Sequence, residues 1–437
     1  MTISSLPDLT RYHLALNQLN TVRLSGRIIQ VVGLTIEATG LDCQIGEVCE
    51  IRANDGPPLI AEVVGFREQR TLLMPLGDMQ GIQPGCPIIP LRTAFRTPVG
   101  EALLGRVLDG LGKPIDGKGP LGELHTVPTY NAAPHPLNRQ AITEPMVTGI
   151  RVLDGLLTTG KGQRLGIFAG SGVGKSVLLG SIARNSKADV SVIALVGERG
   201  REVQEFIDHD LGEQGLKRSV VVVSTSDQPA LIRLKAAWVS TSIAEYFRAN
   251  GLNVTLLMDS VTRFAMAQRE VGLAIGEPPA SKGYPPSVFA QMPKLLERAG
   301  NNDKGSITGF YTVLVEGDDF TEPICDAARS ILDGHIVLTR DLAARNHYPA
   351  IDVLNSVSRV MPAVTTPEHR TSAAKVRKLL ATYEKARDLI NIGAYVKGSD
   401  PEIDAAINAM PAILALLQQG QNEFTSFEEC QRMMQAI

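Results

Sequence analysis

A glycine-rich loop between a strand pattern and a helix pattern constrains the fold of this chain more than any other feature. The apolar run GQRLGIFA, residues 162–169, predicts a buried strand, and VLLGSIA, residues 177–183, predicts the start of a helix. The residues that join them are Gly170, Ser171, Gly172, Val173, Gly174, Lys175 and Ser176. Glycines allow the amides of such a loop to turn inward around phosphate oxygens, at a helix N-terminus whose dipole favours anions. The sequence therefore predicts a nucleotide-phosphate site.

The side chains that close this loop predict a nucleoside triphosphate bound with Mg²⁺. We expect Lys175 to reach the β- and γ-phosphates and the Ser176 hydroxyl to bind the metal. The usual pattern begins with a glycine where this chain has Ala169, but the glycines that follow keep the loop flexible. A chance glycine turn with a surface lysine is the alternative, and the flanking strand and helix disfavour it.

Two carboxylates follow other strand patterns. Asp259 closes the apolar run NVTLLMD, and a carboxylate at the carboxyl end of a strand can hold a metal-bound water. Glu198 follows the run SVIALVG and is a candidate to orient and polarise an attacking water. Taken alone, an aspartate after a strand is more often a helix cap or turn residue, and the segment 197–202 could be a solvated charged turn.

A fourth element, residues 348–359, supplies an aromatic ring and an arginine. Tyr348 opens the segment YPAID and could stack on an adenine face. Arg359 ends the segment SVSR and could stabilise charge that develops on a γ-phosphate. From physical chemistry alone, a purely structural role is the more common outcome for both residues.

The order of the patterns predicts an α/β core. From about residue 93, strand runs alternate with long helical patterns, which is typical of a parallel sheet covered by helices. The predicted strands are GQRLGIFA, SVIALVG, SVVVVST, NVTLLMD, ITGFYTVLV and GHIVL. A helix is expected from about Pro229 to Asn250, with Asp227 near its cap and Trp238 in the core.

Different patterns flank this core. Short β-branched or alternating runs between about Thr21 and Pro90 predict a small antiparallel β-barrel. The preceding stretch from Leu6 to Leu19 fits either a short helix or an arm that orders on a partner.

Beyond about residue 361 the patterns are helical. One helix is expected from Pro367 to about Ile392, and a second from residue 400, with Pro411 expected to kink or split it. Ser426 and Glu429 predict the capping box of a last short helix.

Composition excludes several classes of function. The 43 Lys and Arg residues nearly balance 46 Asp and Glu residues, which argues against a general nucleic-acid surface. Five cysteines without a CxxC pair predict a reducing, cytosolic setting. The seven histidines show no ligand spacing, and we expect neither a structural metal, a secretory signal nor a membrane span.

Longer segments resemble a known family. GERGREV, LLMDSVTRFAMAQREVGLAIGEPPASKGYPPSVFA and YPAIDVLNSVSR together resemble the rotary-type RecA-like ATPases, which include F- and V-type catalytic subunits and type III export ATPases. The resemblance is dense from about Gly105 to Arg359. Within the family, GSGVGKSVLLG, LLERAGN and GAYVKGSDPEID are most similar to the flagellar export ATPases, with the virulence-associated export ATPases as the close alternative.

The resemblance implies a domain plan and a set of site residues. It implies an N-terminal partner-binding segment at 1–20, a β-barrel at 21–92, a RecA-like nucleotide-binding domain at 93–362 and a helical C-terminal domain at 363–437. Lys175 and Ser176 take the phosphate and Mg²⁺ positions, and Asp259 takes that of the Walker B carboxylate, which holds Mg²⁺ through water.

The remaining implied roles concern the attacking water, the γ-phosphate and adenine. Glu198 becomes the catalytic glutamate with Arg199 beside it, and Arg263 takes the place of an arginine near the γ-phosphate. Tyr348 resembles the adenine-stacking residue, and Arg359 resembles the finger that enters the neighbouring subunit's site. A second aromatic wall for adenine is expected from the C-terminal domain, where the resemblance does not choose between candidates such as Tyr395 and Tyr383.

The implied function is ATP hydrolysis that energises the export of flagellar proteins through a type III secretion apparatus. One chain carries the loop, a base candidate and a finger candidate, so a homohexamer could supply every part of each interfacial site. The implied location is the cytoplasm, peripheral to the inner membrane. The implied partners are a stator-like regulatory protein at the N-terminus, a stalk-like coiled-coil protein, export-gate membrane proteins, export substrates and chaperones, with no nucleic acid.

Two other classes share parts of this pattern. A hexameric RNA translocase would need an RNA-binding fold with stacking aromatics before the core, and the predicted barrel offers mainly Phe66 and no basic run. A non-catalytic ring subunit would lack a functional Glu198 or phosphate loop. Turnover of ATP by the isolated chain separates that subunit from an ATPase.

Overall fold

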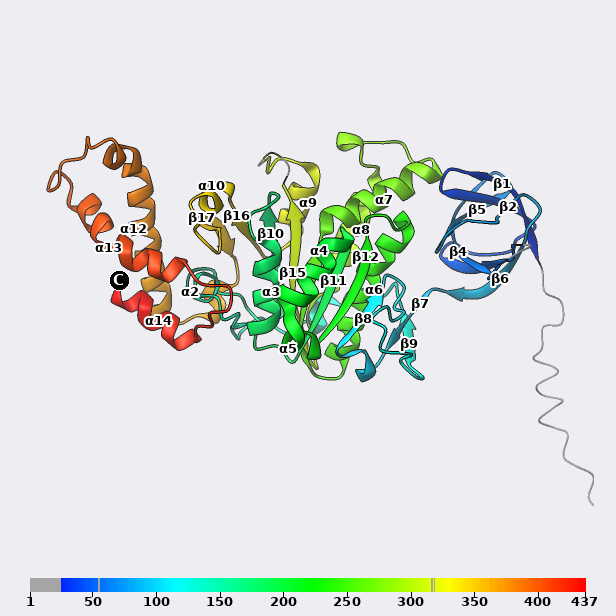
Figure 1. Ribbon diagram of the computed structural model, residues 1–437, viewed down its shortest axis with the longest axis horizontal. Coiled ribbons are helices and arrows are strands. Elements are labelled where there is room, and N and C mark those ends of the chain that lie inside the picture. The colour runs from blue at the N-terminus through cyan, green and yellow to red at the C-terminus, as the bar shows by residue number, and fades with distance from the viewer. Residues whose placement is uncertain (1–24, 54–55, 316, 318) are drawn as a thin grey trace, which may run out of the picture. The chain divides into compact units, whose positions relative to one another are not determined.

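The structure is a computed structural model that describes residues 25–53, 56–315, 317 and 319–437 (Figure 1). The chain divides after Phe95 into two compact units. Both interpretations of Leu6 to Leu19 concern residues outside the described ranges, and the predicted boundaries at 92/93 and 362/363 remain predictions.

The first unit is a closed β-barrel, as the short alternating runs predict. Its strands follow the order β1-β2-β5-β4-β3-β6, and every pairing is antiparallel. Ile36, Ile51 and Ile88 lie in its core. The strands are β1 (Gly26–Val32), β2 (Thr35–Thr39), β3 (Glu47–Ile51), β4 (Leu59–Arg67), β5 (Arg70–Pro75) and β6 (Pro87–Ala94).

The second unit is built on a mostly parallel sheet, which confirms the α/β prediction. The strand order is β17-β16-β10-β15-β13-β11-β12-β8, with β14 added antiparallel to β15 and β17 antiparallel to β16. All six predicted strands are present. The strands are β8 (Arg106–Asp109), β10 (Arg164–Ala169), β11 (Val190–Glu198), β12 (Ser219–Thr225), β13 (Asn253–Asp259), β14 (Gly300–Asn301), β15 (Ser306–Leu314), β16 (Gly334–Leu338) and β17 (Ile351–Ser358). A separate pair joins β7 (Arg96–Val99) and β9 (His125–Pro128).

Helices connect these strands. They are α2 (Arg151–Leu156), α3 (Lys175–Asn185), α4 (Gly200–Glu205), α5 (Gly212–Lys217), α6 (Ala230–Ala249), α7 (Val261–Ile275), α8 (Pro286–Leu296), α9 (Pro323–Ile331), α10 (Arg340–Ala344) and α11 (Met361–Val364), with a π-helical turn η3 (Phe206–Leu211) and 3₁₀ turns at Glu101–Leu103, Pro136–Asn138 and Ser281–Gly283. Helix α6 packs on β11, β12 and β13. Its N-cap is Pro229, two residues after Asp227, and Trp238 is core, 4% exposed.

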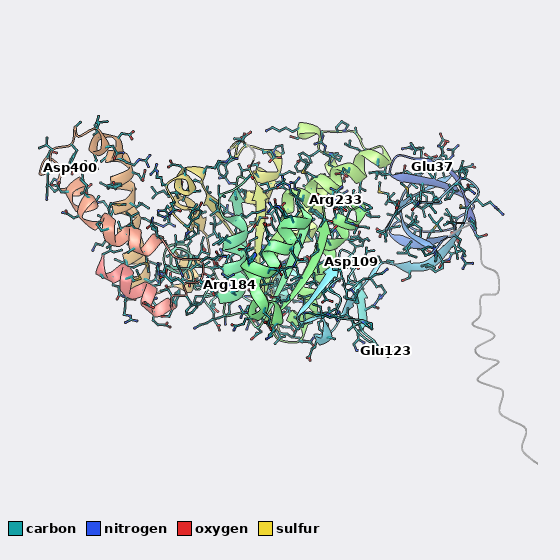
Figure 2. The ribbon with its side chains drawn as sticks, in the orientation of Figure 1. Glu37, Asp109, Glu123, Arg184, Arg233 and Asp400 are labelled. Carbon is teal, nitrogen blue, oxygen red and sulfur yellow. The ribbon has the colours of Figure 1, made fainter. Side chains whose placement is uncertain are left out.

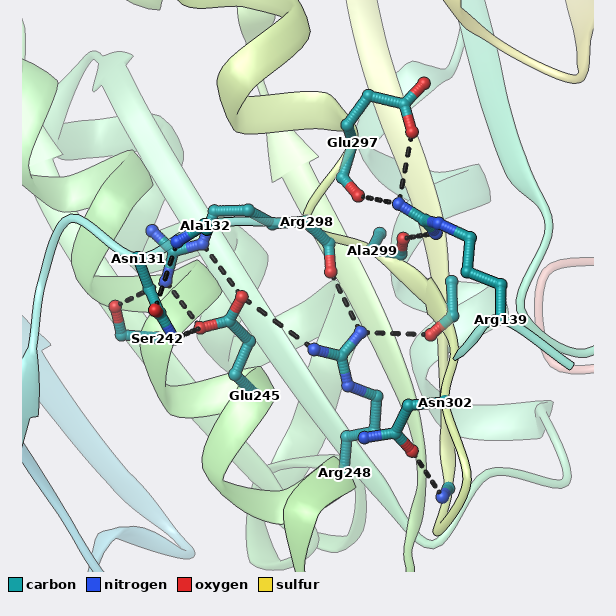
Figure 3. Close-up of polar contacts among 12 residues, drawn as sticks. Asn131, Ala132, Arg139, Ser242, Glu245, Arg248, Glu297, Arg298, Ala299 and Asn302 are labelled. Atoms are coloured by element: carbon teal, nitrogen blue, oxygen red, sulfur yellow. Dashed lines mark hydrogen bonds and ion pairs between the residues drawn. The ribbon is translucent and has the colours of Figure 1, made fainter. Parts of the chain in front are cut away.

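A buried arginine network fixes the segment that follows α8 (Figure 3). Arg298 donates to Glu245 of α6 at 2.8 and 2.6 Å and to the carbonyl of Thr129 at 2.7 Å. Arg248 donates to the carbonyls of Arg298 and Gly300 at 2.9 and 3.1 Å. Because buried charges are stable only when they are paired and hydrogen-bonded, this network holds the strand that enters the centre of the sheet.

The chain ends in three helices, α12 (Pro367–Asn391), α13 (Pro401–Leu417) and α14 (Phe427–Ala436). Asp400, labelled in Figure 2, caps α13 by accepting from the N–H groups of Glu402 and Ile403. Pro411 does not split α13, because the buried residues on both sides of it hold the helix against its neighbours. Ser426 accepts from the N–H of Glu429 at 3.2 Å, which confirms the predicted cap. In the described part of the chain, no helix combines the length and apolarity needed to cross a membrane.

Candidate active site

The phosphate loop lies between β10 and α3. Gly172 and Gly174 have φ of +78° and +85°, a backbone conformation that favours glycine. Ala169, in place of the usual first glycine, ends β10 and is buried, and its carbonyl accepts from the N–H of Val315 at 3.0 Å. Alanine is therefore accommodated as the last residue of the strand, and the loop keeps its turn at the later glycines.

Three charged side chains converge where the strands end. Lys175 opens α3, Glu198 ends β11 and Asp259 ends β13. The Nζ atom of Lys175 is 2.6 Å from Oδ1 of Asp259 and 3.6 Å from Oε1 of Glu198. The carboxyl ends of parallel strands meet at one edge of a sheet, which brings together three residues that are far apart in the sequence.

The two carboxylates determine the charge of the lysine. Burial disfavours the ammonium form of Lys175, but the charges of Asp259 and Glu198 outweigh it and raise the pKa of the lysine. The ammonium group is therefore retained, as contact with phosphate oxygens requires.

Glu198 has the properties of a proton acceptor near neutral pH. Burial raises its pKa to about 7, the charge of Asp259 adds to this, and Lys175 opposes it. A hydrogen bond with Glu202 raises the pKa further. A carboxylate with a pKa close to 7 combines a large ionised fraction with useful basicity.

Asp259 has a second donor that sequence analysis missed. The Thr312 hydroxyl of β15 is 2.7 Å from Oδ1 of Asp259, the same oxygen that accepts from Lys175. Ser260 follows Asp259 and caps α7 by accepting from the N–H of Arg263 at 3.3 Å. Thr312 is one of several hydroxyl residues in β15, so the sequence offered no signal that singled it out.

A cavity of about 440 Å³ adjoins the loop and holds Tyr348. Tyr348 is 41% exposed, and its ring lies close to Gly174 of the loop. A β-carbon built on Gly174 would lie 3.4 Å from a ring carbon of Tyr348. The C-terminal side of the cavity is formed by Gln419, Gly420, Gln421 and Glu423. The N–H of Gln419 donates to the carbonyl of Tyr348 at 2.9 Å, which fixes this side against the ring.

Neither of the tyrosines named as candidates for the second aromatic wall, Tyr383 and Tyr395, lines this cavity. Tyr383 lines a separate cavity, and the Tyr395 hydroxyl donates within the turn before α13, 2.9 Å from the Asp400 carbonyl and 3.0 Å from Asp404. Among the described residues that line the cavity, Tyr348 is the only aromatic one. The segment 419–423 was missed because it carries no periodic or motif signal.

The arginines are placed differently from one another. Arg199 is 75% exposed at its side chain and pairs with Glu202 at 2.8 Å, rather than joining the Lys175 cluster. Arg263 packs against Gly197, the residue before Glu198. A β-carbon built on Gly197 would lie 3.0 Å from the Cβ of Arg263. Arg340, a residue that sequence analysis did not select, lies against the loop with its Nε 3.2 Å from a β-carbon built on Gly170.

Arg359 lies at the end of the strands opposite to the phosphate loop. Ser358 pairs with Gly334 at the start of β16, whereas the loop follows Ala169, which pairs with Leu338 at the end of β16. The Arg359 guanidinium donates to the carbonyl of Leu332 at 3.4 Å, before β16 begins. Gly334 and Leu338 are four residues apart along β16, a distance of about 13 Å. Arg359 therefore does not join the Lys175 cluster of its own chain.

Comparison with known proteins identifies relatives over nearly the whole chain. Residues 28–92 and 149–358 match the β-barrel and nucleotide-binding domains of the ATP synthase alpha/beta family, and residues 365–436 match the C-terminal domain of the T3SS EscN ATPase. The flagellum-specific ATP synthase of Pseudomonas aeruginosa is 54% identical over 95% of this chain and 93% of its own length. The type 3 secretion system ATPase of Xanthomonas euvesicatoria is 51% identical over 95% and 94%.

Solved structures agree with these matches. The assembled ATPase EscN of the enteropathogenic E. coli type III secretion system superposes with a TM-score of 0.89, at 48% identity over 94% of this chain and 99% of EscN. EscN in complex with its central stalk EscO gives a TM-score of 0.87 at 48% identity, with the same coverage of both chains. With its phosphate loop and strand-end carboxylates, this chain belongs to the ATP synthase alpha/beta family, in the branch of the type III secretion ATPases, and is a P-loop ATPase.

Proposed function

We propose that this chain hydrolyses ATP with Mg²⁺ at the interfaces of a homohexameric ring and that this turnover energises export of flagellar proteins through a type III secretion apparatus. The observation that carries the proposal is the contact of Lys175 with Asp259 and Glu198 beside a phosphate loop. Export by a virulence-type apparatus is the second candidate, since the Xanthomonas relative and EscN belong to type III secretion systems.

The residues present fit a magnesium ion. Mg²⁺ prefers oxygen ligands and usually takes one or two protein groups together with water and nucleotide phosphates. Ser176 stands in the first turn of α3, and Asp259 ends the strand whose carboxylate faces the loop lysine. We assign the direct contact to the Ser176 hydroxyl and a water-mediated contact to Asp259. When bound, the ion would neutralise charge on the β- and γ-phosphate oxygens.

Each side chain then has a defined task in hydrolysis. The amides of Gly170 to Gly174 bind the phosphate chain, and Lys175 turns from Asp259 to the β- and γ-phosphates. Glu198 accepts a hydrogen bond from the attacking water and takes up its proton. Arg263, which packs against Gly197, the residue before Glu198, supplies positive charge near the γ-phosphate, and Tyr348 stacks on adenine.

Arg359 acts on the site of the adjacent subunit. A finger arginine must reach the γ-phosphate, and the register of β16 and β17 keeps Arg359 away from the loop of its own chain. A second copy that presents its Arg359 edge to the loop edge of the first would complete the site. Such a head-to-tail contact generates a closed ring when the rotation between copies closes.

The wider assembly is proposed by analogy with the relatives. EscN is described as assembled and as forming a complex with its central stalk EscO. We propose the same for this chain, with a stator-like protein on residues 1–20 and with export-gate proteins, chaperones and export substrates as further partners. Residues 21–92, 93–362 and 363–437 are the proposed functional domains, and the proposed location is the cytoplasmic side of the inner membrane.

A mixing experiment tests the shared site. Lys175→Ala and Arg359→Ala should each be inactive alone, the second by about a thousandfold, as for other finger arginines. In an equimolar mixed ring, one interface in four joins the intact Lys175 pocket of one variant to the intact Arg359 of the other. ATP hydrolysis should therefore recover in part, because no single chain in the mixture carries both groups.

Controls separate the possible failures. Native mass spectrometry establishes that subunits exchange. If the exchanged mixture stays at background, rings of wild type doped with each variant decide the cause. A linear loss of activity with variant fraction would then place Arg359 in its own subunit's site and contradict the proposal, whereas a steep loss indicates that all interfaces must be competent together.

A further inference from the structure

A buried hydroxyl next to Asp259 is not used by the proposed mechanism. Thr312 lies on β15, between β10 and β13, and its side chain is fully buried, 0% exposed. Its Oγ1 is 2.7 Å from Oδ1 of Asp259 and 3.3 Å from the carbonyl oxygen of Met258. A hydroxyl has one hydrogen, so the shorter contact with the charged acceptor is the bond that it donates.

The register of the sheet sets this contact. Met258 of β13 pairs with Tyr311 of β15, so the next residues, Asp259 and Thr312, stand side by side at the end of a parallel ladder. Side chains at equivalent levels of neighbouring strands point to the same face. A β-branched residue in a strand has restricted χ1 rotamers, so the backbone of β15 fixes the position of this hydroxyl.

The hydrogen bonds that Lys175 and Thr312 donate to Asp259 should respond differently to nucleotide binding. Lys175 and Thr312 both donate to Oδ1, at 2.6 and 2.7 Å. The proposed function requires the flexible lysine to turn toward phosphate oxygens when nucleotide binds. Thr312 sits in the middle of the sheet and has no second acceptor at comparable distance. Its bond to Oδ1 therefore persists when the lysine leaves.

We propose that Thr312 is a positioning residue that holds Oδ1 of Asp259, so that Oδ2 is presented to the magnesium-bound water. The inference rests on the proposed metal role of Asp259. Partners that orient a metal-binding carboxylate commonly affect metal affinity or activity by about 10- to 100-fold. Without the hydroxyl, the carboxylate rotates more freely once Lys175 has turned away, and the water loses its fixed acceptor.

The neighbouring strand offers a matched control. Thr255 of β13 is also fully buried, and its hydroxyl makes no hydrogen bond with the described residues. Thr255→Val removes the same atom from the same sheet without removing a hydrogen bond. Thr312→Val removes a hydroxyl that contacts Asp259, and Thr312→Ser restores it.

The test measures binding of fluorescent mant-ADP to the full chain, with Mg²⁺ and with EDTA, together with the Mg²⁺ concentration for half-maximal turnover. Thr312→Val should reduce the Mg²⁺-dependent gain in nucleotide affinity and raise the Mg²⁺ requirement, each by about 10- to 100-fold. Affinity in EDTA should stay within about twofold. Thr312→Ser should return both quantities to within about threefold of wild type, since it retains the donor, and Thr255→Val should match wild type.

Two results would overturn the proposal. One is a Thr312→Val protein with the same Mg²⁺ dependence as Thr255→Val. The other is an equal loss of affinity with Mg²⁺ and with EDTA, which would assign Thr312 to the fold rather than to the metal. If Thr312→Val is insoluble, Thr312→Ala is compared with Thr255→Ala by the same criteria.

Asp259→Asn distinguishes this inference from its premise. If Asp259→Asn keeps the wild-type Mg²⁺ dependence, the proposed metal role of Asp259 fails, and the role of Thr312 fails with it. If Asp259→Asn loses that dependence while Thr312→Val keeps it, only the inference about Thr312 fails.

Discussion

Replacing Glu198 with glutamine should separate nucleotide binding from hydrolysis. The amide has nearly the same shape as the carboxylate but cannot accept a proton from water. We expect turnover to fall by at least ~100-fold, the usual scale for loss of a positioned base. Binding of ATP should be retained, because the substitution leaves Lys175, its partner Asp259 and the phosphate loop unchanged.

The same substitution should stabilise the folded protein at alkaline pH. Burial raises the pKa of Glu198 from 4.5 to about 7, so the ionised form is disfavoured in the folded chain. The folded chain therefore keeps its full stability below pH 4.5, where Glu198 is neutral in both states. It loses stability as the pH rises through about 7, because the buried carboxyl group must then ionise. Glu198→Gln should therefore gain ~1–3 kcal/mol in unfolding free energy at pH 8 and less than about 1 kcal/mol at pH 5.

Phosphate release, mant-nucleotide binding and thermal denaturation at pH 5 and pH 8 measure these effects. Glu205→Gln is the control, because Glu205 lies on the adjacent helix and pairs with Arg201 at the surface. It should change none of the three quantities appreciably. Near-normal turnover of Glu198→Gln would remove Glu198 from the role of base, and equal stabilisation at both pH values would refute the burial argument.

Three further outcomes follow from the same site. The kcat/KM for ATP should fall about tenfold from pH 8 to pH 6, since Glu198 must be ionised and its pKa is about 7; a flat wild-type profile contradicts this. Tyr348→Ala should raise the KM for ATP about tenfold or more because one base-stacking contact contributes ~1–3 kcal/mol, while Tyr348→Phe stays near wild type in steady-state assays. Specific activity should fall as dilution dissociates the ring; constant activity in a sample that mass photometry shows to be monomeric would exclude an interfacial site.

The sequence was sufficient for the parts of the site that depend on strand order. Glu198 and Asp259 end apolar runs and Lys175 follows one through the glycine loop, and parallel strands deliver such residues to one sheet edge. The predicted strands and the barrel were confirmed for the same reason, since their periodicity reflects burial on defined faces. These features depend on local pattern and on few possible topologies.

Features that depend on where one element meets another were not predictable. One side of the cavity comes from residues 419–423, and only the return of the chain after α13 brings them beside Tyr348. Tyr395 was a reasonable aromatic candidate, but its hydroxyl is used within the turn before α13. The Thr312 contact required the register of β13 against β15, which no pattern within either strand specifies.

The antiparallel edge strand β17 has a mechanical consequence. Tyr348 lies three residues before Ile351 and Arg359 directly follows Ser358, so β17 joins the proposed adenine contact to the proposed finger. Its register shift against β16 places the two ends of the strand about 13 Å apart. On the proposed assignment, these two side chains serve consecutive sites around the ring. A tilt of β17 when adenine enters one site would then move the finger in the next. This strand would then link the binding of adenine at one site mechanically to the finger at the next.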